Sequence, residues 1–229
     1  MNIISIIPAR GGSKEIPFKN IVKINGKPLL YYTVKASLNS SLVTRTIVST
    51  DNEEIEKIAR KMNAEVIKRP KIISNDSSQL EPVISHVLKF LKRKENYSPD
   101  IIVLLQNTSP LRNSIHVQEA IKLLLAKKYD SVLSGFRSHR FIWKSKGKTV
   151  FPINYDPKKR PRRQEMAKEF IENGAIYITK TKCFNKSNCR ISGKIGLYEI
   201  SENLSLEIDS KFDLELVNHI LQDKKIEKN

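Results

Sequence analysis

The chain has 229 residues, of which 39% are hydrophobic and 28% charged, a composition typical of a soluble globular protein with one full core. Its formal net charge of +17 is compatible with nucleic-acid binding, with an anionic small substrate, or with a general bias towards lysine. No apolar run reaches about 18 residues, and the N-terminus lacks the pattern of a signal peptide, so we expect a cytoplasmic protein without membrane contact. Two cysteines and four scattered histidines match neither a disulfide framework nor a zinc spacing.

Short apolar runs alternate with helical patterns along the first 133 residues. The runs that predict strands are rich in β-branched residues and lie at 3–7, 46–49, 65–67, 101–105 and 131–133. Amphipathic patterns at 51–63, 82–94 and 114–128 predict helices between them. The first pattern has Asp51 and Glu54 at the spacing of a capping box, which predicts Asp51 as the N-cap. The alternation predicts an α/β fold with a mostly parallel sheet covered by helices on both faces.

The regular pattern ends after residue 133. Residues 135–172 are polar, basic and dotted with aromatic side chains, and prolines occur at 152, 157 and 161. This segment is too long for a simple connection, so it is predicted to be an inserted arm, a lid or a partner surface of a single domain spanning 1–229. Strand patterns return in "GAIYIT" and "KIGLYEI", and a final helix is predicted in "FDLELVNHIL".

The stretch "SIIPARGGSKEIPFKN" places glycines and positive charge at the end of the first predicted strand. In open α/β sheets, ligands bind beyond the carboxyl ends of the strands. Gly11 and Gly12 allow backbone amides to approach ligand oxygens, while Arg10, Lys14 and Lys19 supply positive charge. The spacing is neither that of a Walker loop nor that of a dinucleotide-binding loop. The stretch therefore predicts a polyphosphate-binding loop of another type.

An acidic cluster, "LEIDSKFD", precedes the final predicted helix. Glu207 and Asp209 alternate in it, which places both carboxylates on the same face of a strand-like stretch. Two carboxylates on one face suit a hard divalent cation. Asp213 is predicted to be a favourable negative charge at the N-terminus of the final helix.

Several segments together resemble one enzyme family. They are "IIPARGGSKEIPFKN", "STDNEEIEKIARKMNAEVIKRP", "LLQNTSPLR", "RPRRQ", "ENGAIYIT" and "LEIDSKFDLEL", in this order. The chain resembles the cytidylyltransferases that activate sialic acids and related nine-carbon acids, the CMP-N-acylneuraminate synthetases. The resemblance implies a Rossmann-like α/β fold, CTP, Mg²⁺ (with Mn²⁺ as an alternative), and a homodimer. In that dimer the arm crosses to the other subunit, so that one site draws on both chains.

The resemblance also implies roles for individual residues. Those at the reacting groups would be Arg10, Lys14, Lys19 and Asp209. The nucleotide would be bound by Arg10, Gly11, Gly12, Ser13, Lys14, Lys19, Asn20, Arg69, Asp76 and Ser78. The sugar would be bound by Gln106, Ser109, Arg112, Lys144, Arg163, Gln164 and Tyr177, and the metal by Glu207 and Asp209. Three positions depart from the family pattern, namely Glu15 in place of glycine, Asn107 in place of proline, and Glu207 in place of the first aspartate of D-x-D.

The implied reaction joins CTP to a nine-carbon α-keto acid sugar and gives a CMP-sugar and pyrophosphate. Neuraminate, legionaminate and pseudaminate all remain open as the acid. The eight-carbon acid KDO is disfavoured because "RPRRQ" and "NGAIYI" resemble the nine-carbon branch. Two other classes are a basic nucleic-acid-binding protein, suggested by the net charge, and a catalytically silent homologue. No nucleic-acid partner is expected, because the sequence has no aromatic–basic platform or recognition helix.

Overall fold

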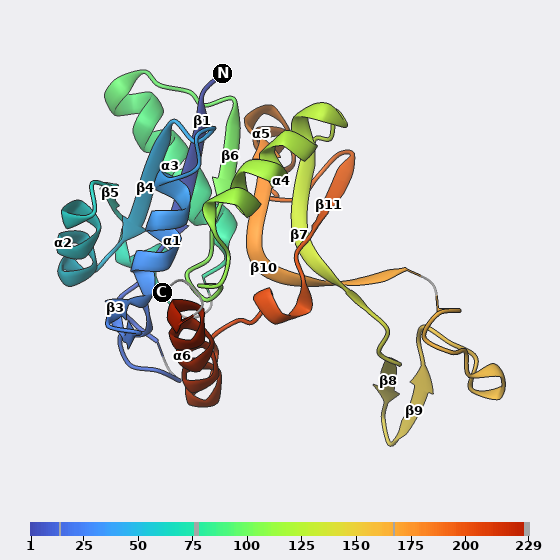
Figure 1. Ribbon diagram of the computed structural model, residues 1–229. Coiled ribbons are helices and arrows are strands. Elements are labelled where there is room, and N and C mark those ends of the chain that lie inside the picture. Colours follow the sequence, from blue (N-terminus) through green and yellow to red (C-terminus); the bar gives the residue numbers. More distant parts are fainter. Residues whose placement is uncertain (14, 76–77, 167, 227–229) are drawn as a thin grey trace.

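The computed structural model describes residues 1–13, 15–75, 78–166 and 168–226, and its centre is a seven-stranded sheet (Figure 1). The strands lie in the order β11-β7-β10-β6-β1-β4-β5. Their bounds are β1 (Ile3–Pro8), β4 (Arg45–Thr50), β5 (Glu65–Lys68), β6 (Ile101–Leu104), β7 (Ser131–Ser138), β10 (Glu169–Lys180) and β11 (Ile195–Glu199). All neighbours are parallel except β10, which runs antiparallel to both β6 and β7. The predicted mostly parallel α/β sheet is confirmed.

Helices cover both faces of this sheet. They are α1 (Leu29–Leu38), α2 (Glu53–Lys61), α3 (Leu80–Glu95), α4 (Ser114–Ala126), α5 (Thr181–Ser187) and α6 (Lys211–Ile226). Buried residues of α1, α2 and α4 pack on one face, and those of α3 and α5 pack on the other. The apolar run that opens the chain forms β1, and both faces of this strand are buried. Ile3 and Ile7 enter the first core, while Ile4 and Ile6 enter the second. Helix α6 packs over a third, smaller cluster beside the hairpin of β2 (Lys23–Ile24) and β3 (Lys27–Pro28).

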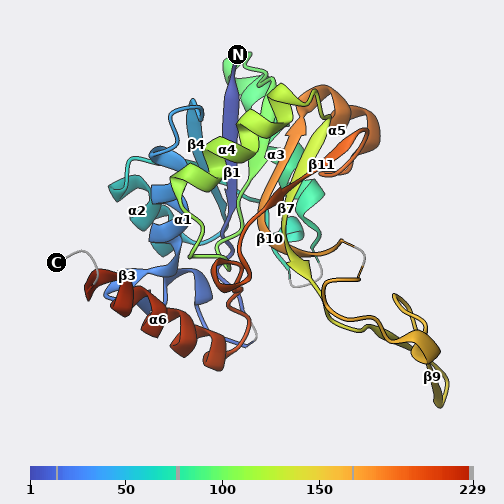
Figure 2. The same cartoon turned by 45° about the vertical axis from the view of Figure 1, so that its right-hand side comes forward.

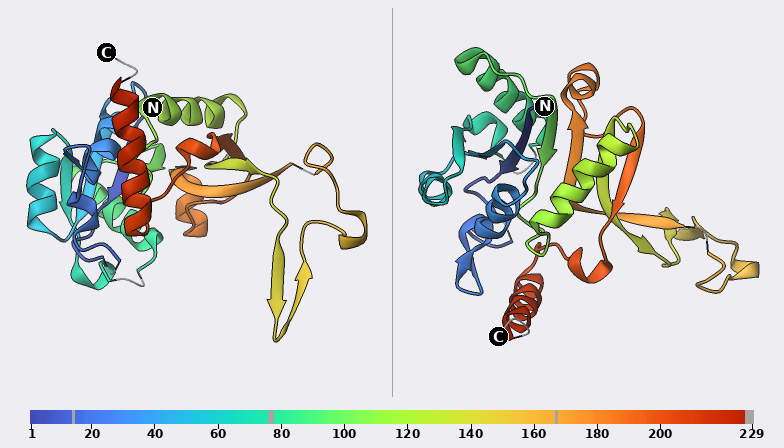
Figure 3. Two further views of the ribbon diagram at one scale, coloured as in Figure 1. Left: turned by 60° about the horizontal axis from the view of Figure 1, so that its bottom comes forward. Right: turned by 45° about the horizontal axis from the view of Figure 1, so that its top comes forward.

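Strands β7 and β10 continue beyond the sheet as a paired ribbon that carries the arm (Figure 2). The ribbon pairs Gly135 with Glu172 and Ser138 with Glu169. Beyond it, the hairpin of β8 (Trp143–Lys146) and β9 (Thr149–Pro152) projects away from the body, as Figure 3 also shows. The irregular part is therefore shorter than the predicted 135–172, because both ends of that segment are regular strand. None of the described helices is long and apolar enough to cross a membrane.

Helix α2 begins one residue later than the capping pattern predicts. The side-chain oxygen of Asn52 accepts hydrogen bonds from the amides of Glu54 (2.9 Å) and Ile55 (3.1 Å), so Asn52 is the N-cap. The prediction that Asp51 caps the helix is wrong. Asp51 Oδ1 instead accepts a hydrogen bond from the amide of Gly11 at 3.0 Å. The start of α2 is thereby tied to the loop that follows β1.

Candidate active site

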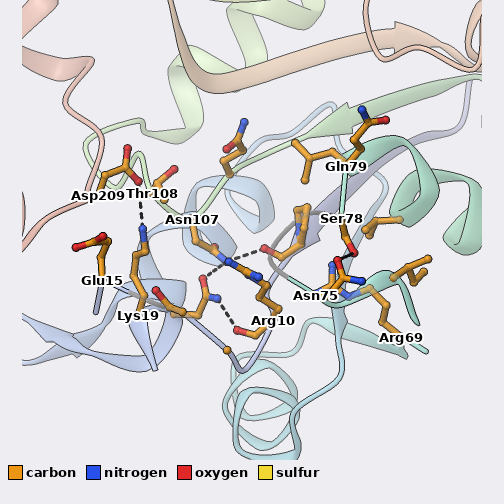
Figure 4. Close-up of a pocket in the computed structure, with 18 residues that line it drawn as sticks. Arg10, Glu15, Lys19, Arg69, Asn75, Ser78, Gln79, Asn107, Thr108 and Asp209 are labelled. Carbon is orange, nitrogen blue, oxygen red and sulfur yellow. Dashed lines mark hydrogen bonds and ion pairs between the residues drawn. The ribbon is translucent and has the colours of Figure 1, made fainter. Parts of the chain in front are cut away.

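A cleft of about 640 Å³ opens at the carboxyl ends of β1, β5 and β6 (Figure 4). Four segments line it: the end of β1 with the loop after it, the loop between β5 and α3 with the start of α3, the residues just after β6, and Asp209 just before α6. Parallel strands bring their carboxyl ends to the same edge of a sheet, which explains why distant segments meet here. The volume lies within the range of small-molecule sites.

The glycines after β1 have different roles. A Cβ atom on Gly11 would lie 2.8 Å from Asn52 Nδ2, so glycine is required for the loop to pack against the start of α2. Since the Gly11 amide already donates to Asp51, it supports the loop and is not directed at a ligand. Gly12 and Ser13 line the cleft, and a Cβ on Gly12 would meet open space. Lys14, predicted to bind phosphate, lies outside the described residues.

An ion pair joins the basic loop to the acidic segment that precedes α6. Lys19 Nζ donates to Asp209 Oδ1 at 3.1 Å and to the carbonyl oxygen of Ile208 at 3.0 Å. Lys19 opens a short 3₁₀ turn after Phe18, whose φ of 53° lies in the left-handed region. The Asp209 side chain remains 70% exposed at the cleft. Residues 190 positions apart therefore meet at one site, as the sequence predicts for the basic loop and the acidic cluster.

The acidic segment is not a strand, contrary to the prediction from its alternation. Glu207 nevertheless lies near Asp209 and Glu172. Its pKa is raised to about 7, first by burial and then by the charges of Asp209 and Glu172. The predicted N-terminal role of Asp213 is confirmed, because its Oδ2 accepts hydrogen bonds from the amides of Asp209 (3.0 Å) and Ser210 (2.7 Å) at the start of α6.

Arg69 occupies a buried position on the wall of the cleft after β5. Its side chain is 4% exposed, and Nη2 lies 3.9 Å from Asp51 Oδ1. Within the described part of the chain, Nε and Nη2 have no hydrogen-bond partner. Burial lowers the pKa of this guanidinium, as does the charge of Arg10. A buried cation with unsatisfied donors fits a ligand that brings acceptor oxygens.

Nearby, Ser78 also lines the cleft, and its hydroxyl donates to Asn75 Oδ1 at 2.7 Å. Asp76 lies outside the described residues.

Of the residues predicted to bind the sugar, Gln106 lines the cleft, whereas Ser109 and Arg112 are buried beneath it. Arg112 is 1% exposed and donates to Thr33 Oγ1 (2.9 Å) and to the carbonyl oxygens of Gln106 (3.0 Å) and Ala175 (3.3 Å). Burial lowers its pKa to about 9. Ser109 is likewise buried, and its hydroxyl donates to a backbone carbonyl of β10. In this structure both residues support the wall of the cleft from within and do not face it.

The remaining predicted sugar residues lie away from this cleft. Tyr177 is buried in β10 and donates its hydroxyl hydrogen to Glu172 Oε1. Lys144 is exposed on β8. Arg163 and Gln164 line a second cavity of about 370 Å³ at the base of the arm.

Sequence reasoning missed Gln79, Asn107 and Thr108 as cleft residues. Their places after the carboxyl ends of β5 and β6 were the available signal.

Comparisons with known proteins bear on this site. The chain matches the family model described as cytidylyltransferase over residues 4–228. N-acylneuraminate cytidylyltransferase A of Danio rerio is 37% identical over 93% of this chain and 49% of its own length. N-acylneuraminate cytidylyltransferase of Escherichia coli O18:K1:H7 is 34% identical over 99% of this chain and 54% of its own length. The chain thus spans about half the length of the curated relatives it matches.

A solved structure of CMP:2-keto-3-deoxy-manno-octonic acid synthetase complexed with CTP superposes with a TM-score of 0.73 at 18% identity, covering 98% of this chain and 100% of that chain. A 4-diphosphocytidyl-2C-methyl-D-erythritol synthase from Anaerococcus prevotii superposes with a TM-score of 0.69 at 14% identity, covering 96% and 98%. These likenesses at low identity concern the fold alone.

Proposed function

Because the chain belongs to the cytidylyltransferase family, we propose that it transfers the cytidylyl group of CTP to a nine-carbon α-keto acid sugar. The observation that carries the proposal is the Lys19–Asp209 ion pair of 3.1 Å, which joins a basic loop and an acidic segment in one cleft. Neutralisation of phosphate and coordination of a cation both need these groups at a single place. The relatives named N-acylneuraminate cytidylyltransferase, at 34–37% identity, favour a nine-carbon acid over KDO.

In the proposed reaction, the C2 hydroxyl of the sugar acid attacks the α-phosphate of CTP in line. A new P–O bond forms, the bond to the β-phosphate oxygen breaks, pyrophosphate leaves, and the hydroxyl proton passes to solvent. Arg10 and Lys19 line the cleft and would balance the charge that grows on the leaving pyrophosphate. Arg69 and Ser78 would hold the base, since both lie on the wall formed by the loop between β5 and α3.

The described residues fit a Mg²⁺ ion that arrives with the nucleotide. Glu207 and Asp209 provide carboxylate oxygens, and a cation would relieve the repulsion that helps to raise the pKa of Glu207. Mg²⁺ is usually held by one or two carboxylates together with substrate phosphates. This fits the finding that no group of three or more His, Cys, Asp or Glu side chains among the described residues could hold a metal. When bound, Mg²⁺ would neutralise phosphate charge and lower the pKa of the attacking hydroxyl.

We further propose a homodimer in which the arm of one subunit completes the cleft of the other. Lys144, Arg163 and Gln164 suit a sugar carboxylate chemically, but they do not line the main cleft of their own chain. The hairpin also exposes large apolar side chains, which a partner would cover. They are Trp143, Val150 and Phe151.

Mixed dimers test this sharing. Arg163→Ala and Asp209→Ala subunits, each inactive alone, would regain about a quarter of wild-type activity after 1:1 exchange, because half of the dimers carry one intact site of two. If activity does not recover although subunit exchange is verified, the proposal of a site shared between subunits is refuted.

The reaction itself is tested by incubating the protein with each of the four nucleoside triphosphates, Mg²⁺ and a panel of sugar acids, and measuring pyrophosphate. Release that requires CTP and a nine-carbon acid supports the proposal. Neuraminate, legionaminate and pseudaminate are assayed separately, so the same experiment identifies the acid. Release with KDO alone moves the assignment to the eight-carbon substrate, and no release with any pair rejects the activity.

A further inference from the structure

The side chain of Asn107 bridges two walls of the cleft. Asn107 follows β6 and is 3% exposed. Its Nδ2 donates to the carbonyl oxygen of Pro8 at 3.2 Å and to Asn20 Oδ1 at 3.0 Å. Asn20 Nδ2 in turn donates to the carbonyl oxygen of Arg10 at 2.8 Å, and Figure 4 draws these bonds as dashed lines beside Asn107 and Arg10 among the residues that line the cleft. Two side-chain amides therefore connect the end of β6 to the loop that follows β1.

The orientation of both amides is determined by the backbone. A carbonyl oxygen can only accept, so the carbonyl of Arg10 requires the nitrogen of the Asn20 amide. The Asn20 oxygen then faces Asn107, and together with the carbonyl of Pro8 it requires the nitrogen of the Asn107 amide. An amide nitrogen carries two hydrogens. Both hydrogens of the Asn107 amide are used in these bonds, whereas the bond to Arg10 uses only one hydrogen of the Asn20 amide.

The same arrangement leaves Asn107 Oδ1 buried and, among the described residues, without a hydrogen-bond donor. An unsatisfied buried acceptor is costly. The amide keeps this cost together with two donated hydrogen bonds, to Pro8 and Asn20, both of which line the cleft. Positions that break such a rule occur mainly at functional sites.

We propose that Asn107 is a positioning residue of the nucleotide site, which holds the amide of Asn20 so that its remaining N–H serves the ligand. The proposal rests on the proposed function, because it takes CTP as the ligand. Asn20 itself lines the cleft, whereas both hydrogens of the Asn107 amide are engaged within the protein. Asn107 therefore acts on the nucleotide through Asn20 and through the loop that carries it.

A double-mutant cycle tests this coupling. The affinity for CTP is measured by isothermal titration calorimetry with Mg²⁺ for the wild type, Asn20→Ala, Asn107→Ala and the double variant. Each single variant is expected to bind CTP about tenfold more weakly, and the double variant also about tenfold, whereas independent sites would give about a hundredfold. At saturating CTP, kcat of Asn107→Ala should stay within about threefold of the wild type, since the role lies in binding.

A matched control is Asn218→Ala on α6. Asn218 Oδ1 accepts a hydrogen bond from the amide of Asn25 at 2.6 Å, away from the cleft, so its loss should lower stability and leave CTP affinity unchanged. Asn107→Ser serves as a second variant, because serine has a single donor and cannot bridge both acceptors.

Additive effects in the cycle, or unchanged CTP affinity in Asn107→Ala and Asn107→Ser, would overturn the positioning role. Loss of the fold in both Asn107 variants would overturn it as well, because the residue would then be structural. A wild-type protein that binds no CTP would instead reject the proposed function, and the two failures are thereby distinguished.

Discussion

Replacement of Gly174 by alanine should move a carboxylate away from the proposed metal position. Gly174 lies in the bulge of β10 with φ of +62°, and an added Cβ would overlap Glu207 Oε1 and lie 3.4 Å from Gln106 Nε2. An L-residue in the left-handed region costs about 1–2 kcal/mol relative to glycine. The overlap itself is relieved cheaply, because the end of a flexible side chain can swing away. Gly174→Ala should therefore lower the free energy of unfolding by about 1–2 kcal/mol and displace the Glu207 carboxylate.

Gly26→Ala is the matched control, since Gly26 has φ of +74° and an added Cβ would find no described atom within 4 Å. Urea unfolding of the two variants should show similar losses, because both carry the same backbone cost. Activity assays distinguish the two variants. The Mg²⁺ concentration for half-maximal pyrophosphate release should rise at least about fivefold in Gly174→Ala but not in Gly26→Ala, which corresponds to about 1 kcal/mol of lost Mg²⁺ binding energy. Equal Mg²⁺ dependence in both variants would refute the argument that Gly174 sets the position of Glu207.

Three further outcomes are expected. Lys19→Ala and Asp209→Ala should each lose at least about 10²-fold in kcat while remaining folded, from lost charge stabilisation, and near-normal turnover would remove that residue from its role. Burial, and then the charge of Arg69, lowers the pKa of His86 in the folded protein. The stability that depends on its neutral form is therefore complete above pH 6.5 and is lost as the pH falls through the pKa of the folded state. Melting temperatures from pH 8 to 5 should therefore fall further in the wild type than in His86→Gln, and parallel curves would contradict this. Arg112→Met should lower the free energy of unfolding in urea by about 2–4 kcal/mol, because two buried carbonyls lose a charged donor. Unchanged stability together with a raised KM for the sugar acid would instead support the predicted contact between Arg112 and the sugar.

The parallel half of the sheet could be predicted from sequence because its strands are buried on both faces. Strand β1 was expected at 3–7 and spans Ile3–Pro8, and β6 was expected at 101–105 and spans Ile101–Leu104. Continuous β-branched runs between amphipathic helices leave few other arrangements. The rule that ligands bind at the carboxyl edge then placed Arg10 and Lys19 at the cleft that the structure contains.

The burial of Arg112 and Ser109 could not be predicted in this way. It depends on β10, which enters between β6 and β7 from far along the chain and runs antiparallel to both. The carbonyl of Ala175, which accepts a hydrogen bond from Arg112, lies within the irregularity between Glu172 and Tyr177. Long-range pairing and its bulges leave little trace in local periodicity. An arginine just after a strand therefore resembled a ligand contact.

The ribbon at the base of the arm was missed for a different reason. Residues 135–138 and 169–172 pair with each other, but the ribbon extends beyond the helices that cover the sheet. Apolar and polar side chains do not alternate cleanly along its two strands, where Arg137 and Phe170 are exposed. Period-two patterning requires one buried face. A strand held mainly by its backbone ladder resembles a loop in sequence.

Asn107 shows how a departure from a family pattern can be interpreted physically. Proline, which the resemblance implies at this position, would restrict the backbone through its ring. Asparagine cannot do so, yet its side chain connects the same loop to Pro8 and Asn20 through two hydrogen bonds. Two side-chain hydrogen bonds thus restrain the loop in place of the proline ring, so the departure does not imply a looser site. Because water can compete for these bonds, the position of Asn20 depends on keeping water away from the Asn107 amide.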